Sequence, residues 1–154
     1  MVQLKKILCP VDFSDCSRSA LDEALKLAKR FDAELTVLHC FEGSQYVRPD
    51  LVGWTYAGEH RPLREIAQDD ATAELEALRT TLGDPSGVKW RVEEGAPVET
   101  ILEESNAGLY DLIVVGTHGR TGLSHLLMGS VAERVVRGAA CPVLTLRGPK
   151  QEAA

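Results

Sequence analysis

The chain has 154 residues, of which 44% are hydrophobic and 26% charged, and its formal net charge is −6. This length predicts one domain with a sizeable core, and the acidic balance argues against nucleic acid as the main partner, since phosphate neutralisation needs a surplus of Lys and Arg. The N-terminal residues pass directly into an expected strand, with no apolar leader and no run long enough to span a bilayer, so we expect a cytoplasmic protein that does not enter membranes.

The four cysteines, Cys9, Cys16, Cys40 and Cys141, are scattered along the chain. They form no C-x2-C pair and have no histidine spacing suited to zinc, which is typical of reduced thiols. We therefore expect no metal site built by protein side chains alone.

The first expected element is a strand over residues 5–11, an apolar run that ends near Pro10, which cannot donate to a sheet ladder. Asp12 comes next, at the carboxyl end, where open parallel sheets bind ligands. Two interpretations stay open for Asp12. It contacts a ligand, through an adenine amine, a ribose hydroxyl or a metal, or it is a turn residue that caps the next helix.

A helix is expected from Ser14 or Ser17 to about Phe31, with its apolar stripe facing inward, and a second strand over residues 34–40. His39, at the end of that strand, either touches a ligand or is a structural residue with satisfied hydrogen bonds. The second interpretation is the simpler one.

Between residues 41 and 61 the apolar pattern dissolves into interleaved glycines, prolines and aromatic residues, which predicts one long loop. Trp54 and Tyr56 could fold over a nucleotide base, meet a second subunit or pack on their own loop.

The second half of the chain repeats the alternation of helices and strands. The expected elements are a helix from Pro62 to about Gly83, a strand over 88–93, a short helix after Gly95-Ala96-Pro97, a strand over 112–115, a helix over 131–137, a strand over 143–146 and a frayed tail over 148–154.

A glycine-rich loop joins the strand over 112–115 to the last helix. Gly116, Gly119 and Gly129 can let backbone N–H groups turn toward an anion, and the helix N-terminus adds the positive end of its dipole. Ser130 and Glu133 form an S-x-x-E capping box at the helix start. The loop contains neither Gly-Lys-Ser/Thr nor a G-x-G start, so it is not a P-loop or a dinucleotide fingerprint. A ligand that carries phosphate is expected here.

The spacing G-x2-G-x9-G-S, from Gly116 to Ser130, resembles the ATP-binding branch of the universal stress protein family. The resemblance extends over nearly the whole chain. Its other marks are Pro10-Val11-Asp12, His39-Cys40, Gly95-Ala96-Pro97 and Cys141-Pro142-Val143.

The alternation of strands and helices predicts a single α/β domain over residues 1–147, with a doubly wound, five-stranded parallel sheet and helices on both faces. The resemblance implies the strand order 3-2-1-4-5, which sets Asp12 opposite the Gly116 loop. It also implies a homodimer that pairs through the last strand.

The resemblance further implies an ATP site, with Mg²⁺ as the companion of the phosphates. Pro10, Val11, Asp12 and Cys40 would hold adenine and ribose, Val115 and Gly116 would pass beneath the sugar, and Gly119, Arg120, Gly129, Ser130 and Val131 would hold the phosphates. His118 either reaches the phosphates or points to water.

No pair of general acid and base can be argued from the sequence, and no catalytic residue is assigned. We expect a nucleotide-dependent regulatory module of the stress response with, at most, slow ATP hydrolysis, acting on an unidentified protein partner. The alternatives are an ATP-hydrolysing or nucleotidyl-transferring enzyme and an interaction protein that binds no nucleotide.

Overall fold

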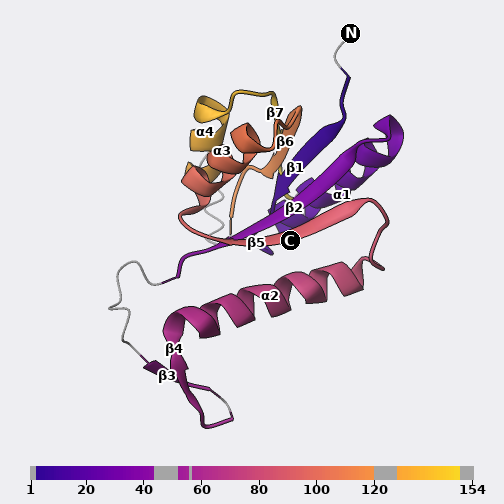
Figure 1. Cartoon of the computed structure of the whole chain (residues 1–154). Coiled ribbons are helices and arrows are strands. Elements are labelled where there is room, and N and C mark those ends of the chain that lie inside the picture. The colour runs from indigo at the N-terminus through magenta and orange to yellow at the C-terminus, as the bar shows by residue number, and fades with distance from the viewer. Residues whose placement is uncertain (1–2, 44–51, 56, 120–127, 150–154) are drawn as a thin grey trace, which may run out of the picture.

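The structure is a computed structural model that describes residues 3–43, 52–55, 57–119 and 128–149 (Figure 1). In chain order its elements are β1 (Lys6–Pro10), α1 (Asp15–Phe31), β2 (Glu34–Phe41), β3 (Val52–Trp54), β4 (His60–Pro62), α2 (Leu63–Thr81), β5 (Val88–Glu94), α3 (Pro97–Ala107), β6 (Leu112–Gly116), α4 (Ser130–Gly138) and β7 (Val143–Leu146). No helix within these ranges is both long enough and apolar enough to cross a bilayer.

Five parallel strands form the main sheet in the order β5-β2-β1-β6-β7. Because β5, β6 and β7 are the third, fourth and fifth strands of this sheet along the chain, the predicted order 3-2-1-4-5 is confirmed. β1 pairs with β2 from Lys6↔Glu34 to Pro10↔Leu38. With β6 it shares only Ile7↔Leu112 and Leu8↔Ile113, so these two central strands part before their carboxyl ends.

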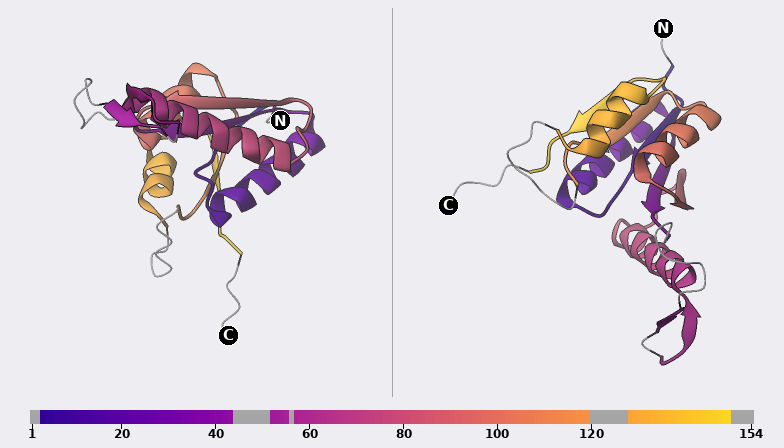
Figure 2. Two further views of the ribbon diagram at one scale, coloured as in Figure 1. Left: turned by 90° about the horizontal axis from the view of Figure 1, so that it is seen from below. Right: turned by 90° about the vertical axis from the view of Figure 1, so that its left-hand side faces the viewer.

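Helices cover both faces of the sheet, as predicted: α1 and α2 lie on one side, and α3 and α4 on the other (Figures 1 and 2). The period-two alternation of the strands divides the core between these layers. Ile7 and Cys9 of β1 pack on the side of α1 and α2. Leu8, between them, packs on the side of α3 and α4.

The first residues of α1 and α4 show which of the predicted capping residues are the actual N-caps. Ser14 is the N-cap of α1, and its hydroxyl accepts a hydrogen bond from the Ser17 amide. At α4 the predicted capping box is wrong: Gly129, with extended backbone angles, is the N-cap and Ser130 is already the first helical residue. Its hydroxyl is therefore one position too late to cap, and α4 begins one residue earlier than predicted.

The segment 41–61 is more than the loop expected from its composition. β2 extends to Phe41, and β3 pairs with β4 in an antiparallel hairpin that leads into α2. A Cβ on Gly53 would lie 2.6 Å from a side-chain carbon of Leu63, so the hairpin packs closely on the first turn of α2. The contact is between residues ten positions apart in different elements. A local apolar pattern cannot show such a contact, so it did not predict the hairpin.

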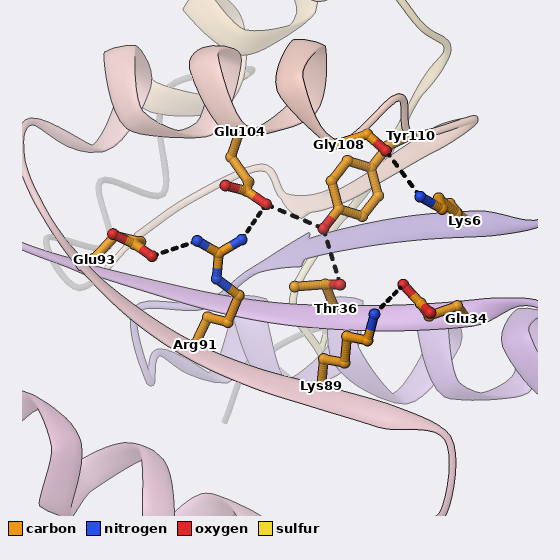
Figure 3. Close-up of polar contacts among 9 residues, drawn as sticks. All are labelled: Lys6, Glu34, Thr36, Lys89, Arg91, Glu93, Glu104, Gly108 and Tyr110. Carbon is orange, nitrogen blue, oxygen red and sulfur yellow. Dashed lines mark hydrogen bonds and ion pairs between the residues drawn. The ribbon is translucent and has the colours of Figure 1, made fainter.

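A polar network fixes α3 on the sheet (Figure 3). The Tyr110 hydroxyl lies 2.9 Å from Thr36 Oγ1 on β2 and 3.2 Å from Glu104 Oε1 on α3. Arg91 of β5 is bonded to both Glu104 and Glu93. The C-terminal half of α3 is thus tied to two strands, and this anchorage sets the place of its N-terminal turn, which reaches the candidate site.

Candidate functional site

A cavity of about 280 Å³ opens at the carboxyl ends of β1, β2 and β6, where β1 and β6 have parted. A crevice at this edge is the usual ligand site of doubly wound sheets. Of the residues predicted for the nucleotide site, those that line the cavity are Pro10, Val11, Asp12, Cys40, Val115, Gly116, His118, Gly119, Gly129, Ser130 and Val131. Arg120, the remaining one, lies outside the described residues.

Six further residues line the cavity but were not predicted: Ser17, Leu38, Pro97, Ile101, Thr117 and Ala132. Thr117 and Ala132 are chain neighbours of predicted residues, and Pro97 belongs to the Gly95-Ala96-Pro97 turn motif. Ile101 comes about one helical turn after Pro97, so it faces the same way. Leu38 and Ser17 had no signal, because only the tertiary fold brings them to the cavity.

Asp12 lies in a tightly bonded turn between β1 and α1. Its Oδ1 accepts hydrogen bonds from the Ser14 amide at 3.0 Å and the Ser14 hydroxyl at 2.5 Å. Its own amide lies 3.3 Å from Ser17 Oγ. A Cβ on Gly119 would be 2.6 Å from Asp12 Oδ2, so the carboxylate reaches across the cavity mouth to the glycine loop. Asp12 thus holds the turn before α1, although Ser14 and not Asp12 is the N-cap of that helix, and it also lines the cavity. Its contact with a ligand stays a prediction.

Two glycines of the loop are required by close backbone contacts. A Cβ on Gly116 would lie 2.9 Å from the backbone carbon of Cys16, at the start of α1. A Cβ on Gly129 would lie 2.9 Å from the Thr117 carbonyl oxygen. The spacing of the glycine pattern therefore reflects two places where other backbone segments leave no room for a side chain.

The first turn of α4 supplies the backbone donors of the cavity. The first hydrogen bond of the helix runs from the Glu133 amide to the Gly129 carbonyl over 3.0 Å. The amides of Ser130, Val131 and Ala132 precede it, and within the described ranges they have no acceptor. These residues line the cavity, so the positive end of the helix dipole points at this space.

One predicted donor is already used. The Gly129 amide donates to the Thr117 carbonyl over 2.5 Å, so it faces the protein and not the cavity. The expectation that this amide holds a phosphate is wrong. Gly129 contributes space, and the amides after it contribute the donors.

His118 and Cys16 are linked through Thr117. Thr117 Oγ1 lies 3.0 Å from His118 Nδ1, and 3.7 Å from Cys16 Sγ. The buried Cys16 thiol donates to the Leu146 carbonyl over 3.2 Å. The Thr117 hydroxyl therefore orients the imidazole of His118, which is the only histidine among the described residues that line the cavity.

Another part of the cavity lining is apolar and includes Leu38, Cys40, Ile101 and Val115. Cys40 is a free thiol, like the other three cysteines. Burial, with the nearby Glu93 carboxylate second, raises the pKa of Cys40 to about 12. Cys40 is thus a small neutral group of the lining. A cavity lined by both apolar side chains and backbone amides suits a ligand with a flat ring and an anionic tail.

The remaining side chains that the sequence suggested as possible ligand contacts do not line the cavity or lie outside the described residues. Among the described residues no group of three or more His, Cys, Asp or Glu side chains could hold a metal ion. The Trp54 ring contacts the His60 ring of its own hairpin in a tilted arrangement, with centroids 3.7 Å apart, and Tyr56 lies outside the described residues. His39 Nδ1 is 2.9 Å from the Val11 carbonyl oxygen, which agrees with the structural interpretation of this residue.

Comparison with known proteins gives a consistent result. Residues 3–147 match the profile of the Universal stress protein family. The chain is 38% identical over 150 residues to a universal stress protein of Methanocaldococcus jannaschii, which covers 96% of this chain and 85% of the relative. Among solved structures, universal stress protein UspA from Lactobacillus plantarum superposes with a TM-score of 0.80 at 29% identity, covering 96% of this chain and 100% of that one. A universal stress protein solved in complex with cAMP has a TM-score of 0.58 at 25% identity, covering 92% and 95%.

Proposed function

The chain belongs to the universal stress protein family, and from that premise we propose that its cavity binds an adenine nucleotide, with ATP as the main ligand. The observation that carries the proposal is a lining that combines apolar side chains with backbone donors. The apolar side chains of Leu38 and Ile101 and the first-turn amides of α4 belong to the lining of one cavity. The related protein in complex with cAMP supports a nucleotide as the class of ligand.

The phosphates would be held by main-chain donors more than by basic side chains. The amides of Ser130, Val131 and Ala132 are pre-oriented, and a hydrogen bond to a charged group contributes about 1.5–3 kcal/mol. A micromolar ligand needs about 8 kcal/mol in total. Three such bonds, with burial of the base against the apolar side chains, therefore suffice for micromolar affinity after ordering costs.

Mg²⁺ would accompany the triphosphate, because the cavity also contains the Asp12 carboxylate, which by itself repels phosphate. Mg²⁺ bound to the phosphates would reduce that repulsion by lowering their negative charge. Arg120, which the resemblance assigns to the phosphates, and His118 would add positive charge or hydrogen bonds to them.

The proposal makes this protein a regulatory module of the stress response, whose empty and occupied states differ and which hydrolyses ATP slowly at most. It would act in the cytoplasm, where millimolar ATP fills a micromolar site, and as a homodimer. Among the described strands β7 has one neighbour, β6, and this supports the dimer, because an unpaired strand edge tends to pair with another strand.

The test is calorimetric titration of the protein with Mg·ATP, using two site variants. Gly129→Val places side-chain atoms against the Thr117 carbonyl and is expected to abolish binding. Val131→Asp introduces a carboxylate into the first turn of α4, where the helix dipole favours it, so the fold is retained while the triphosphate is repelled. We expect the affinity of this variant to fall at least about tenfold.

Val136→Asp is the matched control, since Val136 is an exposed residue of the same helix that does not line the cavity. It is expected to bind Mg·ATP like the wild type. If folded, heat-stable wild-type protein shows no binding and no thermal shift with Mg·ATP, the chain is better explained as an interaction protein that binds no nucleotide. Steady-state turnover faster than about 1 per second would favour an enzyme.

A further inference from the structure

His39, near the carboxyl end of β2, is bonded to the turn that carries Asp12. Its Nδ1 lies 2.9 Å from the Val11 carbonyl oxygen, and because a carbonyl only accepts, Nδ1 carries the hydrogen. The imidazole also packs on the ring of Phe13, with centroids 4.4 Å apart and an interplanar angle of 50°. One side chain of β2 therefore contacts the residues on both sides of Asp12.

The imidazole takes the place of a sheet hydrogen bond. The Val11 amide donates to the Leu38 carbonyl over 2.8 Å, as in a continuing parallel ladder. The next bond of such a ladder would run from the Cys40 amide to the Val11 carbonyl. That carbonyl accepts from the His39 side chain instead, and no bond between these two backbone groups occurs in the described part of the chain. β1 and β2 thus part where Val11 and Cys40 line the cavity.

The turn itself adopts a conformation that needs support. Phe13 has φ of +65°, in the left-handed region that bulky L residues rarely adopt. Such a conformation persists only where the surroundings hold it. On one side the Asp12 carboxylate is bonded to Ser14. On the other side His39 holds the Val11 carbonyl and the Phe13 ring.

We propose that His39 is a positioning residue of the nucleotide site, which fixes the turn that presents Val11 and Asp12 to the cavity. The inference rests on the proposed function, because its consequence is a change in nucleotide affinity. His39 does not line the cavity itself, so its effect would pass through the turn.

Three substitutions separate its two contacts. His39→Asn can place an N–H near the position of Nδ1 but removes the ring, His39→Phe keeps a ring on Phe13 but removes the donor, and His39→Ala removes both. We expect His39→Phe and His39→Ala to weaken Mg·ATP binding about tenfold, and His39→Asn to stay within about threefold of the wild type. AMP binding is expected to fall by the same factors, because the turn is assigned to the base and ribose.

Leu78→Ala is the control for lost stability alone, since Leu78 is a buried residue of α2 that does not line the cavity. All titrations are made at a temperature where every variant is folded by circular dichroism. If the His39 variants melt earlier but bind as the wild type and Leu78→Ala do, His39 is only structural and the inference is overturned. If the wild type binds neither ATP nor AMP, the proposed nucleotide-binding function is itself wrong. This outcome differs from the one that overturns only the role of His39.

Discussion

At the scale of single residues, two bulky side chains have left-handed backbone angles in very different surroundings. Phe13, with φ of +65°, belongs to the bonded turn at the cavity. Leu109, with φ of +52°, lies just after the end of α3 and is 79% exposed. The Tyr110 amide donates to the Ser105 carbonyl over 3.3 Å, which is the closing bond of a Schellman motif. That motif prefers glycine or asparagine at the position of Leu109, so the strain there is not offset by burial.

We therefore expect Leu109→Asn to stabilise the protein by about 0.5–1 kcal/mol, because Asn tolerates the left-handed region and little apolar surface is lost. Urea unfolding measures the change. Leu109→Ala is the matched control, since alanine removes the same exposed apolar side chain but lacks the polar group with which asparagine tolerates the left-handed region. Equal stability of the two variants would show that the backbone angle is not the cause. Neither change should alter Mg·ATP affinity, because Leu109 does not line the cavity.

At the scale of elements, local spacing located the glycines of the loop better than it located the segments around them. Gly116 and Gly129 are dictated by contacts at fixed places of the loop, so their residue type can be seen in the sequence. The hairpin of β3 and β4 depends on the contact of Gly53 with Leu63, which needs the tertiary fold. The predicted start of α4 is one residue late, because a capping pattern does not show which residue leaves the helical conformation.

Asp111, just before β6, connects this strand to the start of β1. The contact lies at the amino ends of the two strands, away from the cavity. Asp111 Oδ2 accepts from the backbone amides of Lys5, at 2.8 Å, and Lys6, at 2.9 Å, ahead of and at the start of β1. These bonds lower the pKa of Asp111 in the folded protein. A lowered folded pKa contributes stability above the unfolded pKa of about 3.9, and this contribution is lost as the pH falls through the folded pKa.

We expect Asp111→Ala to lower the free energy of unfolding by about 1 kcal/mol at pH 7, a value reduced for the exposure of these bonds. The difference from the wild type should shrink below pH 4. Asp111→Asn, which keeps an oxygen acceptor without a titrating group, should fall between the two and vary less with pH. Urea unfolding at pH 7 and pH 3 tests this, and a gap that stays constant would contradict the assignment.

At the scale of the whole molecule, topology creates the crevice. β1 shares only two residue pairs with β6, while the connections from β1 to β2 and from β5 to β6 lie on opposite faces of the sheet. The carboxyl ends of the central strands are thus left open between two helical layers. The alternation of elements predicted the α/β class, but several strand orders fit the same connections. The correct order came from the family resemblance, because local sequence carries no information on which strands become neighbours.

The same topology leaves β7 with one neighbour, β6, among the described strands, and Leu144 on it is 37% exposed. If β7 pairs across a two-fold axis, as proposed, the two copies of Leu144 lie near each other. Leu144→Lys would then set two positive charges together and remove apolar contact. We expect the wild type to be a dimer by light scattering at micromolar concentration and Leu144→Lys to be a monomer that still binds Mg·ATP. Phe31→Lys, at the end of α1 and 51% exposed, is the control and should stay dimeric. A dimeric Leu144→Lys variant would place the interface elsewhere, and a monomeric wild type would contradict the dimer itself.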